Sequence, residues 1–295
     1  MGGGAVTLLA IETASDMVGV ALVRDDGASA ERVHTGGRAH AELLIPSVEE
    51  VLTVSGCVIA DVDVIAVDIG PGLFTGLRVG VATAKALGQA LSVGVLGLSS
   101  LDILAAAVLD GAGAGQPGPD GSDALSEPSS TVVSVIDARR GEVFAAAYRL
   151  DSGGGADRPD GPVDPGSVRD DRGGPIPPDA LEAWLVELVE AHGRITVVGD
   201  GAARYRHQLA SHEGVDLDHA TALSFPPPLA QAHLAMARLS RGDEPQPAGE
   251  VVPDYRRPAD ARINWEQRAP RPPSTAADTA GADTAAPRRS GQGTP

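Results

Sequence analysis

The chain has 295 residues, of which 42% are hydrophobic, so it is long and apolar enough for one large or two modest domains. Forty acidic residues against 23 basic ones give a formal net charge of −17, which argues against nucleic-acid binding by this chain alone. The single cysteine, Cys57, excludes an internal disulfide and a cysteine-rich zinc site.

The first part of the chain predicts a β-meander followed by a helix. Strand patterns cover residues 6–12, 17–23 and 29–35, with polar or glycine-containing turns between them. Apolar residues then recur with helical spacing over residues 41–52, where Pro46 is expected to bend the helix or to restrict its first turn. The N-terminal stretch lacks a basic start and a long apolar run, so we expect a cytoplasmic protein without membrane contact.

The central stretch, residues 62–91, predicts a buried strand, a glycine-rich turn and a long helix. Residues 62–69 are apolar on both alternating faces apart from two aspartates, as in a strand covered on both sides. The turn at 70–74 tolerates unusual backbone angles, and Thr75 is positioned to cap the helix. Such a turn could bind phosphate, although neither the P-loop pattern nor the GxGxxG spacing is present. The alternative is a tight turn packed against its own domain, and both interpretations stay open.

Small residues recur every four positions along the central helix, at Gly76, Gly80, Ala84 and Gly88. Each helical glycine costs about 1 kcal/mol relative to alanine, so the stripe indicates that another backbone lies very close. We interpret the stripe as an interface, either inside the chain or with a partner.

The remainder of the chain predicts a second unit of similar design. A strand at 93–96 and a helix at 99–109, capped by Ser99 or Ser100, complete a first lobe of residues 1–110. Residues 111–130 have the composition of a flexible linker. Residues 131–148 then repeat the strand-turn-strand opening of the first lobe.

The second lobe is expected to cover residues 131–263. Its later elements are expected to be a low-complexity insertion at 151–178, helices at 179–191, 202–209 and 228–239, and a strand at 195–198. Residues 264–295 have the composition of a disordered tail.

Polar residues near the predicted turns are candidates for binding chemistry. Thr75 and Arg78 could hold an anion at the helix start, although capping and a surface ion pair are the simpler explanation. Asp137 and Arg139, in the turn of the second lobe, either border a cleft between the lobes or form a plain hairpin turn. The turn at 199–201 is a further candidate to face a nucleotide.

Two lobes that each open with strand-turn-strand resemble the actin-like ATPase (ASKHA) superfold of sugar kinases and Hsp70-type chaperones. More specific stretches are similar to the TsaB (YeaZ) family, a bacterial subunit needed to make N6-threonylcarbamoyladenosine in tRNA. These stretches are LLAIETASDMVGVAL, RAHAELLIPSVEEVL, IGPGLFTGLRVGVATAKALGQAL, GLSSLDILA, VIDARRGEVFAAAY and VPDYRR. The resemblance implies an α/β fold of two actin-like lobes, each starting with a β-meander packed by helices.

The resemblance also implies a non-catalytic partner of TsaD, the related subunit that carries an HxxxH metal site and transfers the threonylcarbamoyl group. This sequence contains no HxxxH, and His207 and His212 are five positions apart rather than four. We therefore expect no catalytic residues, no metal and no intrinsic cofactor, with ATP or ADP as a candidate ligand at the interface of the complex. Glu12 stands where actin-like ATPases usually place an aspartate, which disfavours nucleotide hydrolysis.

By the same resemblance, the helices at 41–52 and 75–91 are expected to bind TsaD or, in its absence, a second copy of this chain. The expected interface residues are Ala41, Leu44, Ile45, Val48, Leu52, Leu77, Gly80, Val81, Ala84, Gly88 and Leu91. Residues expected at a nucleotide or interlobe site are Glu12, Thr13, Thr75, Arg78, Asp137 and Arg139. The ATPase TsaE is a further expected partner, and tRNA is expected to bind only through the complex.

Two other classes of function stay open. An active actin-fold ATPase or small-molecule kinase would need phosphate and metal contacts from both lobes. A glycoprotease would need a metal or a nucleophile with its base, and it ranks last because neither HExxH nor GxSxG is present.

Overall fold

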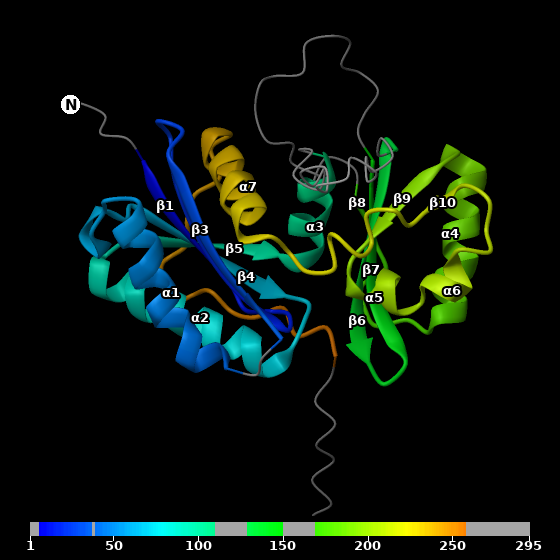
Figure 1. Ribbon diagram of the computed structural model, residues 1–295, viewed down its shortest axis with the longest axis horizontal. Helices are drawn as coiled ribbons and strands as arrows, with labels where there is room; N and C mark the ends of the chain where they lie inside the picture. The colour runs from blue at the N-terminus through cyan, green and yellow to red at the C-terminus, as the bar shows by residue number, and fades with distance from the viewer. Residues whose placement is uncertain (1–5, 37–38, 110–128, 150–168, 258–295) are drawn as a thin grey trace, which may run out of the picture. The chain divides into compact units, whose positions relative to one another are not determined.

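A computed structural model describes residues 6–36, 39–109, 129–149 and 169–257 (Figure 1). The expected linker at 111–130 lies almost entirely outside these residues, as do most of the insertion and the whole expected tail. Two five-stranded sheets organise the described part of the chain. None of its described helices is long and apolar enough to cross a bilayer.

The first sheet has the strand order β3-β2-β1-β4-β5. Its strands are β1 (Thr7–Glu12), β2 (Met17–Arg24), β3 (Ser29–Thr35), β4 (Val64–Gly70) and β5 (Gly94–Ser99). β1, β2 and β3 form the antiparallel meander that the sequence predicts, while β4 lies parallel to β1 and β5 parallel to β4.

The second sheet has the order β10-β9-β6-β7-β8. Its strands are β6 (Thr131–Arg139), β7 (Glu142–Arg149), β8 (Arg169–Asp171), β9 (Ile195–Val198) and β10 (Val215–Asp216). β6, β7 and β8 are antiparallel neighbours, and β9 and β10 continue the sheet in parallel from β6. The second sheet therefore repeats the first strand for strand, which confirms the expected actin-like fold of two lobes.

The first sheet is covered on both faces, as Figure 1 shows. Leu9 and Ile11 of β1 pack in one core with α1 (His40–Val54) and α2 (Phe74–Leu91). Their neighbours Leu8 and Ala10 point to the opposite face, where they share a core with α3 (Ser100–Leu109) and α7 (Pro228–Ser240). This alternation along one strand explains why β1 is apolar at every position before Glu12 apart from Thr7.

The second sheet is packed in the same way. Val133, Val135 and Val197 face a core with α4 (Pro178–His192), α5 (Asp200–Arg204) and α6 (Arg206–Leu209). Val132 and Tyr148, on the other face, belong to the core that contains α3 and α7. One core thus joins the two sheets through α3. A short 3-10 helix, η1 (Ile59–Asp61), precedes β4.

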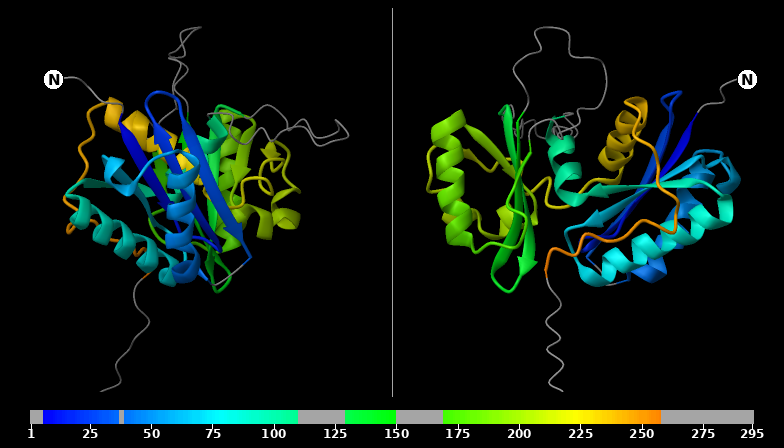
Figure 2. Two further views of the ribbon diagram at one scale, coloured as in Figure 1. Left: turned by 60° about the vertical axis from the view of Figure 1, so that its left-hand side comes forward. Right: turned by 180° about the vertical axis from the view of Figure 1, so that it is seen from behind.

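The expectation that the helix at 228–239 belongs to the second lobe is wrong, because α7 packs on β1 and β2 of the first sheet. The ring of Pro228 lies 3.0 Å from where a side chain on Gly19 of β2 would begin. The chain then continues along the first lobe, where Gln246 bridges to Val95 and residues 246–255 run past α2 (Figure 2). A helical pattern reveals which side of a helix is apolar, but not which sheet that side covers.

The insertion predicted at 151–178 includes residues that belong to the second sheet. Residues 169–171 form β8, whose Asp171 pairs with Ala146, and Ile176 forms an isolated bridge with Val143. The short polar segment RDD at the edge of a sheet lacks the apolar alternation that predicts a strand. β10 has only two residues, which is too short for a strand pattern, and the single helix expected at 202–209 is two short helices, α5 and α6.

Candidate functional site

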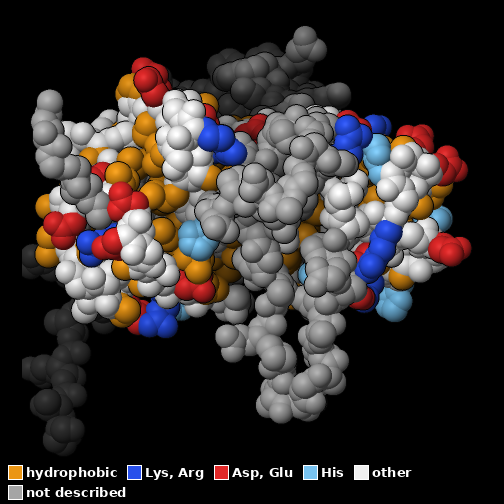
Figure 3. Space-filling view, turned by 90° about the horizontal axis from the view of Figure 1, so that it is seen from above, with side chains coloured by type: hydrophobic (Ala, Val, Ile, Leu, Met, Phe, Trp, Pro, Cys, Tyr) orange, Lys and Arg blue, Asp and Glu red, His pale blue; other side chains and the backbone are white. Residues whose placement is uncertain are grey.

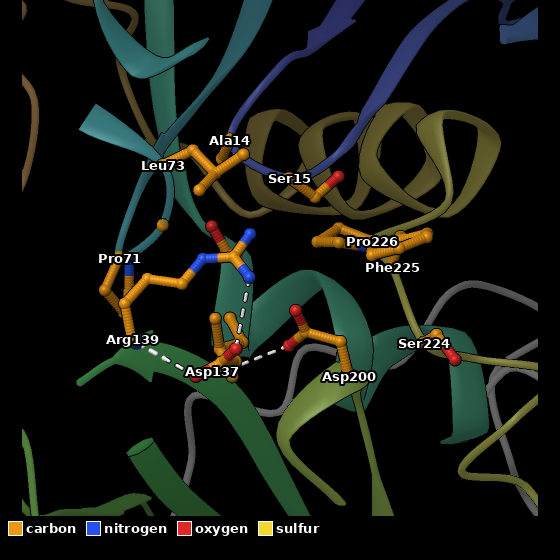
Figure 4. Close-up of a pocket in the computed structure, with 13 residues that line it drawn as sticks. Ala14, Ser15, Pro71, Leu73, Asp137, Arg139, Asp200, Ser224, Phe225 and Pro226 are labelled. Carbon is orange, nitrogen blue, oxygen red and sulfur yellow. Dashed lines mark hydrogen bonds and ion pairs between the residues drawn. The ribbon is translucent and has the colours of Figure 1, made fainter. Parts of the chain in front are cut away.

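A narrow cleft lies where the two lobes meet (Figure 4). The turn after β1 and the end of β6 form opposite walls, and the turn before α2, the starts of α3 and α5 and residues 224–226 close the remaining sides. The lining residues are Ala14, Ser15, Pro71, Gly72, Leu73, Ser100, Ile136, Asp137, Arg139, Asp200, Ser224, Phe225 and Pro226. Asp137 and Arg139 therefore border a cleft between the lobes.

Arg139 crosses this cleft. Its Nη2 donates a hydrogen bond of 2.9 Å to Asp16 of the first lobe, and its Nη1 lies 3.2 Å from Asp137. The hydrogen bond to Asp16 is the main cause that raises the pKa of Arg139. Arg139 has a φ of 63°, which is uncommon for a residue with a side chain. Arg204 also binds Asp137, at 3.1 Å, so this carboxylate holds two guanidinium groups on the wall of the cleft.

Asp200 is one of two carboxyl groups that line the cleft. Burial, together with the charge of Asp137, raises the pKa of Asp200 to about 6. The backbone N–H of Asp137 donates to Asp200 Oδ1 at 2.9 Å, which ties the start of α5 to the end of β6. The turn at 199–201, which the sequence had suggested as a nucleotide-facing candidate, thus contributes a residue to the cleft.

Two carboxyl groups, Glu12 and Asp68, are fully buried behind the wall of the cleft. Glu12 Oε1 accepts hydrogen bonds from Ala14 N and Ser15 Oγ, at 2.9 and 3.1 Å. Asp68 Oδ1 accepts from Gly70 N at 2.7 Å and from Ser100 Oγ at 2.6 Å. The second oxygens, Glu12 Oε2 and Asp68 Oδ2, have no such donor among the described residues.

A shared proton explains this arrangement. Burial, and then the charge of Asp68, raise the pKa of Glu12 well above its usual value, and burial also raises the pKa of Asp68. Two adjacent buried carboxyls cannot both be ionised at low cost, so the folded state favours one proton shared between Glu12 and Asp68. The carboxyl of Glu12 therefore lies behind the wall and does not face the cleft.

The other residues expected at a nucleotide site lie elsewhere. Thr13 is buried, and its Oγ1 donates a hydrogen bond of 2.8 Å to Gly76 O, which joins the end of β1 to α2. Thr75 and Arg78 are exposed on α2 and do not line the cleft. Thr75 does not cap α2 either, because the helix begins at Phe74 with Leu73 as its N-cap and without a side-chain cap.

The small-residue stripe packs inside the chain. A side chain at Gly76 would meet Thr13 O, one at Gly80 would meet Thr13 Oγ1, and one at Gly88 would lie 2.9 Å from Ala248 and Val95. Most residues expected at a partner interface are buried for the same reason, and these are Leu44, Val48, Leu52, Leu77, Gly80, Val81, Ala84 and Gly88. Since these side chains fill the core of the first lobe, they cannot also contact a partner.

The exposed side of α1 and α2 carries a different set of residues. Phe74, Arg78, Ala82 and Ala86 recur every four positions and are all exposed, so they share one side of α2. Ala41 and Ile45 are exposed on α1, and Leu91 is half-buried at the end of α2. We call these seven residues, together with Tyr255, the docking face. The sequence signal that could have found this face is the second four-residue spacing of α2, offset by two positions from the glycine stripe.

An aromatic cluster marks one end of the docking face. Phe74 is 54% exposed and Tyr255 is 46% exposed, and their ring centroids lie 5.3 Å apart. The guanidinium of Arg78 lies 3.8 Å from the centroid of Phe74, and its Nε donates to Tyr255 Oη at 3.2 Å. Such a cluster is unusual on a chain in which aromatic residues make up only 3%. Exposed aromatic rings with an arginine are typical of protein interfaces.

The remaining surface offers fewer signals. On the face seen in Figure 3, acidic, basic and apolar side chains are interspersed. Among the described residues, no group of three or more histidine, cysteine or acidic side chains is arranged to hold a metal ion.

Comparison with known proteins relates both lobes to one family. The model of the TsaD family, tRNA N6-adenosine threonylcarbamoyltransferase, matches residues 31–157. The tRNA threonylcarbamoyladenosine biosynthesis protein TsaB of Bacillus subtilis is 27% identical over 88% of this chain and 98% of its own length. TsaB of Escherichia coli is 33% identical over 50% of this chain and 57% of its own length. An uncharacterised protein of Mycobacterium bovis is 40% identical, and the match spans 59% of that relative's length.

Solved structures agree with these sequence relatives. YeaZ from Pseudomonas aeruginosa has a TM-score of 0.60 and 25% identity over 85% of this chain and 99% of its own. Another Pseudomonas aeruginosa structure, described as similar to peptidase YEAZ, has a TM-score of 0.64 and 26% identity over 85% of this chain and all of its own. Together with the two lobes of equal topology, these matches show that the chain belongs to the TsaB (YeaZ) family.

Proposed function

We propose that this protein is a non-catalytic subunit of the machinery that makes threonylcarbamoyladenosine in tRNA, and that it acts by binding TsaD. The family relatives named for this pathway support the general role. The observation that carries the specific role is the docking face, on which the exposed Phe74 and Tyr255 contact each other beside Arg78.

The chemistry of the docking face suits a second protein. Ala82 and Ala86 leave a shallow surface along α2, on which a helix of the partner can lie close to the backbone. Phe74, Tyr255 and Ile45 supply exposed apolar area that water solvates poorly and that a partner would bury. The buried glycine stripe holds α2 firmly on its own sheet, so that the docking face is rigid before the partner arrives.

Within this proposal, TsaD supplies the metal, the substrate site and catalysis, and tRNA binds through the complex. The ATPase TsaE joins the pair and resets it between turnovers, and ATP or ADP binds at the interface of the complex. In the absence of TsaD, a second copy of the chain covers the same face. The complex works in the cytoplasm.

An actin-fold ATPase or small-molecule kinase is the second candidate, and the cleft with Asp137 and Asp200 favours it. Two observations weigh against it. The Arg139–Asp16 ion pair crosses the cleft, and Glu12 is fully buried with Asp68 behind its wall instead of facing a phosphate or a metal-bound water. Turnover of ATP by the isolated chain would favour this candidate.

The deciding experiment is threonylcarbamoylation of tRNA in vitro with TsaD, TsaE, ATP and preformed threonylcarbamoyl-adenylate, with and without this chain. We expect product only when this chain and TsaD are both present. Product without the chain, or product from the chain alone, would overturn the proposed role.

A pair of matched variants tests the docking face. Ala82→Arg places a bulky charge on α2, and Ala183→Arg places the same charge on α4, where the residue is equally exposed on a helix of the second lobe. We expect Ala82→Arg to weaken TsaD binding at least about tenfold, as loss of a central interface contact does, and Ala183→Arg to leave it unchanged. Equal binding by both variants would remove the docking face from the proposal.

A further inference from the structure

The last described segment, residues 245–257, is fixed on the first lobe along most of its length. Gln246 and Val95 exchange two backbone hydrogen bonds of 2.9 Å at the edge of the first sheet. Val251 is buried in the core under α2, and its carbonyl accepts a hydrogen bond of 3.1 Å from Lys85 Nζ. Asp254 N then donates to Ile69 O of β4 at 2.7 Å.

The residues after Asp254 divide between two surfaces. Tyr255 packs against Phe74 and accepts the hydrogen bond of Arg78, so it belongs to the docking face. Arg256 points instead to the second lobe, where its Nη1 donates to Asp171 Oδ1 of β8 at 2.7 Å. Its Nε donates to Asp254 Oδ2 at 2.6 Å, and only 10% of its side chain is exposed.

Arg257 makes a second tie to the second lobe. Its Nη2 donates to Glu142 Oε2 of β7 at 2.6 Å and to Ala138 O of β6 at 3.1 Å. A buried or half-buried guanidinium is costly to leave without its carboxylate, so these two arginines hold β6, β7 and β8 in place against the segment. We call Arg256 and Arg257, with their partners Asp171 and Glu142, the clasp.

The clasp and the cleft act on the same hairpin. The β6–β7 hairpin is tied to the first lobe by Arg139 and Asp16 at its turn, and to residues 254–257 by Ala138 and Glu142 just beside that turn. A movement of the second lobe must therefore change both ties together. Such a movement also displaces the backbone of Tyr255. The residue before it, Asp254, is hydrogen-bonded to β4, and the residue after it, Arg256, is hydrogen-bonded to β8.

We propose that the clasp couples the docking face to the placement of the second lobe, so that partner binding and lobe arrangement control each other. The identity of the partner, TsaD, rests on the proposed function, whereas the coupling rests on the contacts of residues 254–257. A partner that packs on Tyr255 favours the lobe arrangement in which the clasp is closed. By linkage, partner binding shifts the lobes towards the closed arrangement by a certain factor. Closing the lobes strengthens partner binding by that same factor, and opening them weakens it.

The experiment measures hydrogen–deuterium exchange and TsaD affinity for variants that break the clasp without touching the docking face. Arg256→Gln removes the ion pairs with Asp171 and Asp254, whereas Glu142→Gln removes only the ion pair with Arg257, so the two variants break the clasp from opposite sides. Arg194→Gln is the matched control, because it breaks an ion pair of 2.7 Å with Asp216 inside the second lobe. Thermal unfolding verifies that each variant is folded. If Arg256→Gln does not fold, Glu142→Gln alone tests the coupling, because the side chain of Glu142 is partly exposed.

We expect both clasp variants to raise exchange in the peptide covering residues 71–79 at least about threefold, and to weaken TsaD binding about five- to tenfold, as a modest allosteric coupling would. The control should change neither. Unchanged exchange at 71–79 in a folded clasp variant would overturn the coupling, even if TsaD binds well. Failure of the wild-type chain to bind TsaD would instead overturn the proposed function, while the exchange result still decides the coupling.

Discussion

Thr13 Oγ1 donates a hydrogen bond of 2.8 Å to the carbonyl of Gly76, and the carbonyl of Thr13 occupies the space that a side chain at Gly76 would need. The end of β1 and the first turn of α2 are therefore in direct backbone contact. This contact explains why the helix keeps a glycine at a position where alanine would favour helix formation.

The Gly76→Ala variant should lose about 2–3 kcal/mol of unfolding free energy, because a methyl group there overlaps the backbone of Thr13 and forces β1 and α2 apart. Denaturant unfolding measures the loss. Gly249→Ala is the control, since nothing lies within 4 Å of that position, and it should stay within about 0.5 kcal/mol of wild type. A neutral Gly76→Ala variant would contradict the close contact.

The Glu12–Asp68 pair should make the protein less stable as the pH rises. Burial and the charge of Asp68 raise the pKa of Glu12, so the folded state binds a proton that the unfolded state releases above its ordinary pKa. The stabilising effect of this proton is complete below the unfolded pKa and is lost as the pH rises through the folded pKa. Glu12→Gln keeps the donor to Asp68 and should be at least about 1 kcal/mol more stable than wild type at pH 8.

Chemical denaturation of wild type and Glu12→Gln between pH 4 and pH 9 measures this effect. The advantage of the variant should shrink towards pH 4, where Glu12 is protonated in both states. A stability difference that does not vary with pH would show that the two carboxyls do not share a proton.

Asp200 should titrate near pH 6, because burial and the charge of Asp137 raise its pKa to about 6 from 3.8. Its folded pKa is raised, so the wild-type protein should lose about 1–3 kcal/mol of stability between pH 4 and pH 7 through this group. Asp200→Asn keeps the acceptor for Asp137 N and should lack that loss. Carboxyl NMR titration checks the assignment, and a midpoint below pH 4.5 would contradict it.

The contact of α7 with α3 should be essential for stability. Asp102 of α3 accepts hydrogen bonds from Tyr148 Oη of β7 at 2.7 Å and from Arg238 Nη2 of α7 at 2.9 Å. Asp102→Ala leaves a half-buried guanidinium and a buried hydroxyl without this carboxylate, and should cost about 3 kcal/mol. Tyr148→Phe, which removes one hydrogen bond, should cost only about 1–2 kcal/mol. Equal costs in thermal unfolding would argue against an ionic tie between α7 and α3.

Much of the fold could be predicted from the sequence because it depends on local patterns. The meander β1 to β3, the helices α1, α2 and α4, and the repeat of the strand-turn-strand opening all follow from periodicity and turn residues. The motif stretches that resemble TsaB also indicated the family, which the comparisons then showed. β8 and β10 were not predicted because strands of two or three residues at a sheet edge are too short to show a period.

The candidate sites depended on contacts that no local pattern contains. The sequence by itself determined that α2 has a stripe of small residues and that the two lobes share one design. Only the tertiary structure decided that this stripe packs against β1, that the opposite side of α2 is exposed, and that Tyr255 joins Phe74 across 180 positions of chain. The physical reason is that periodicity reports which residues share a face, whereas the packing of distant segments decides which face is covered.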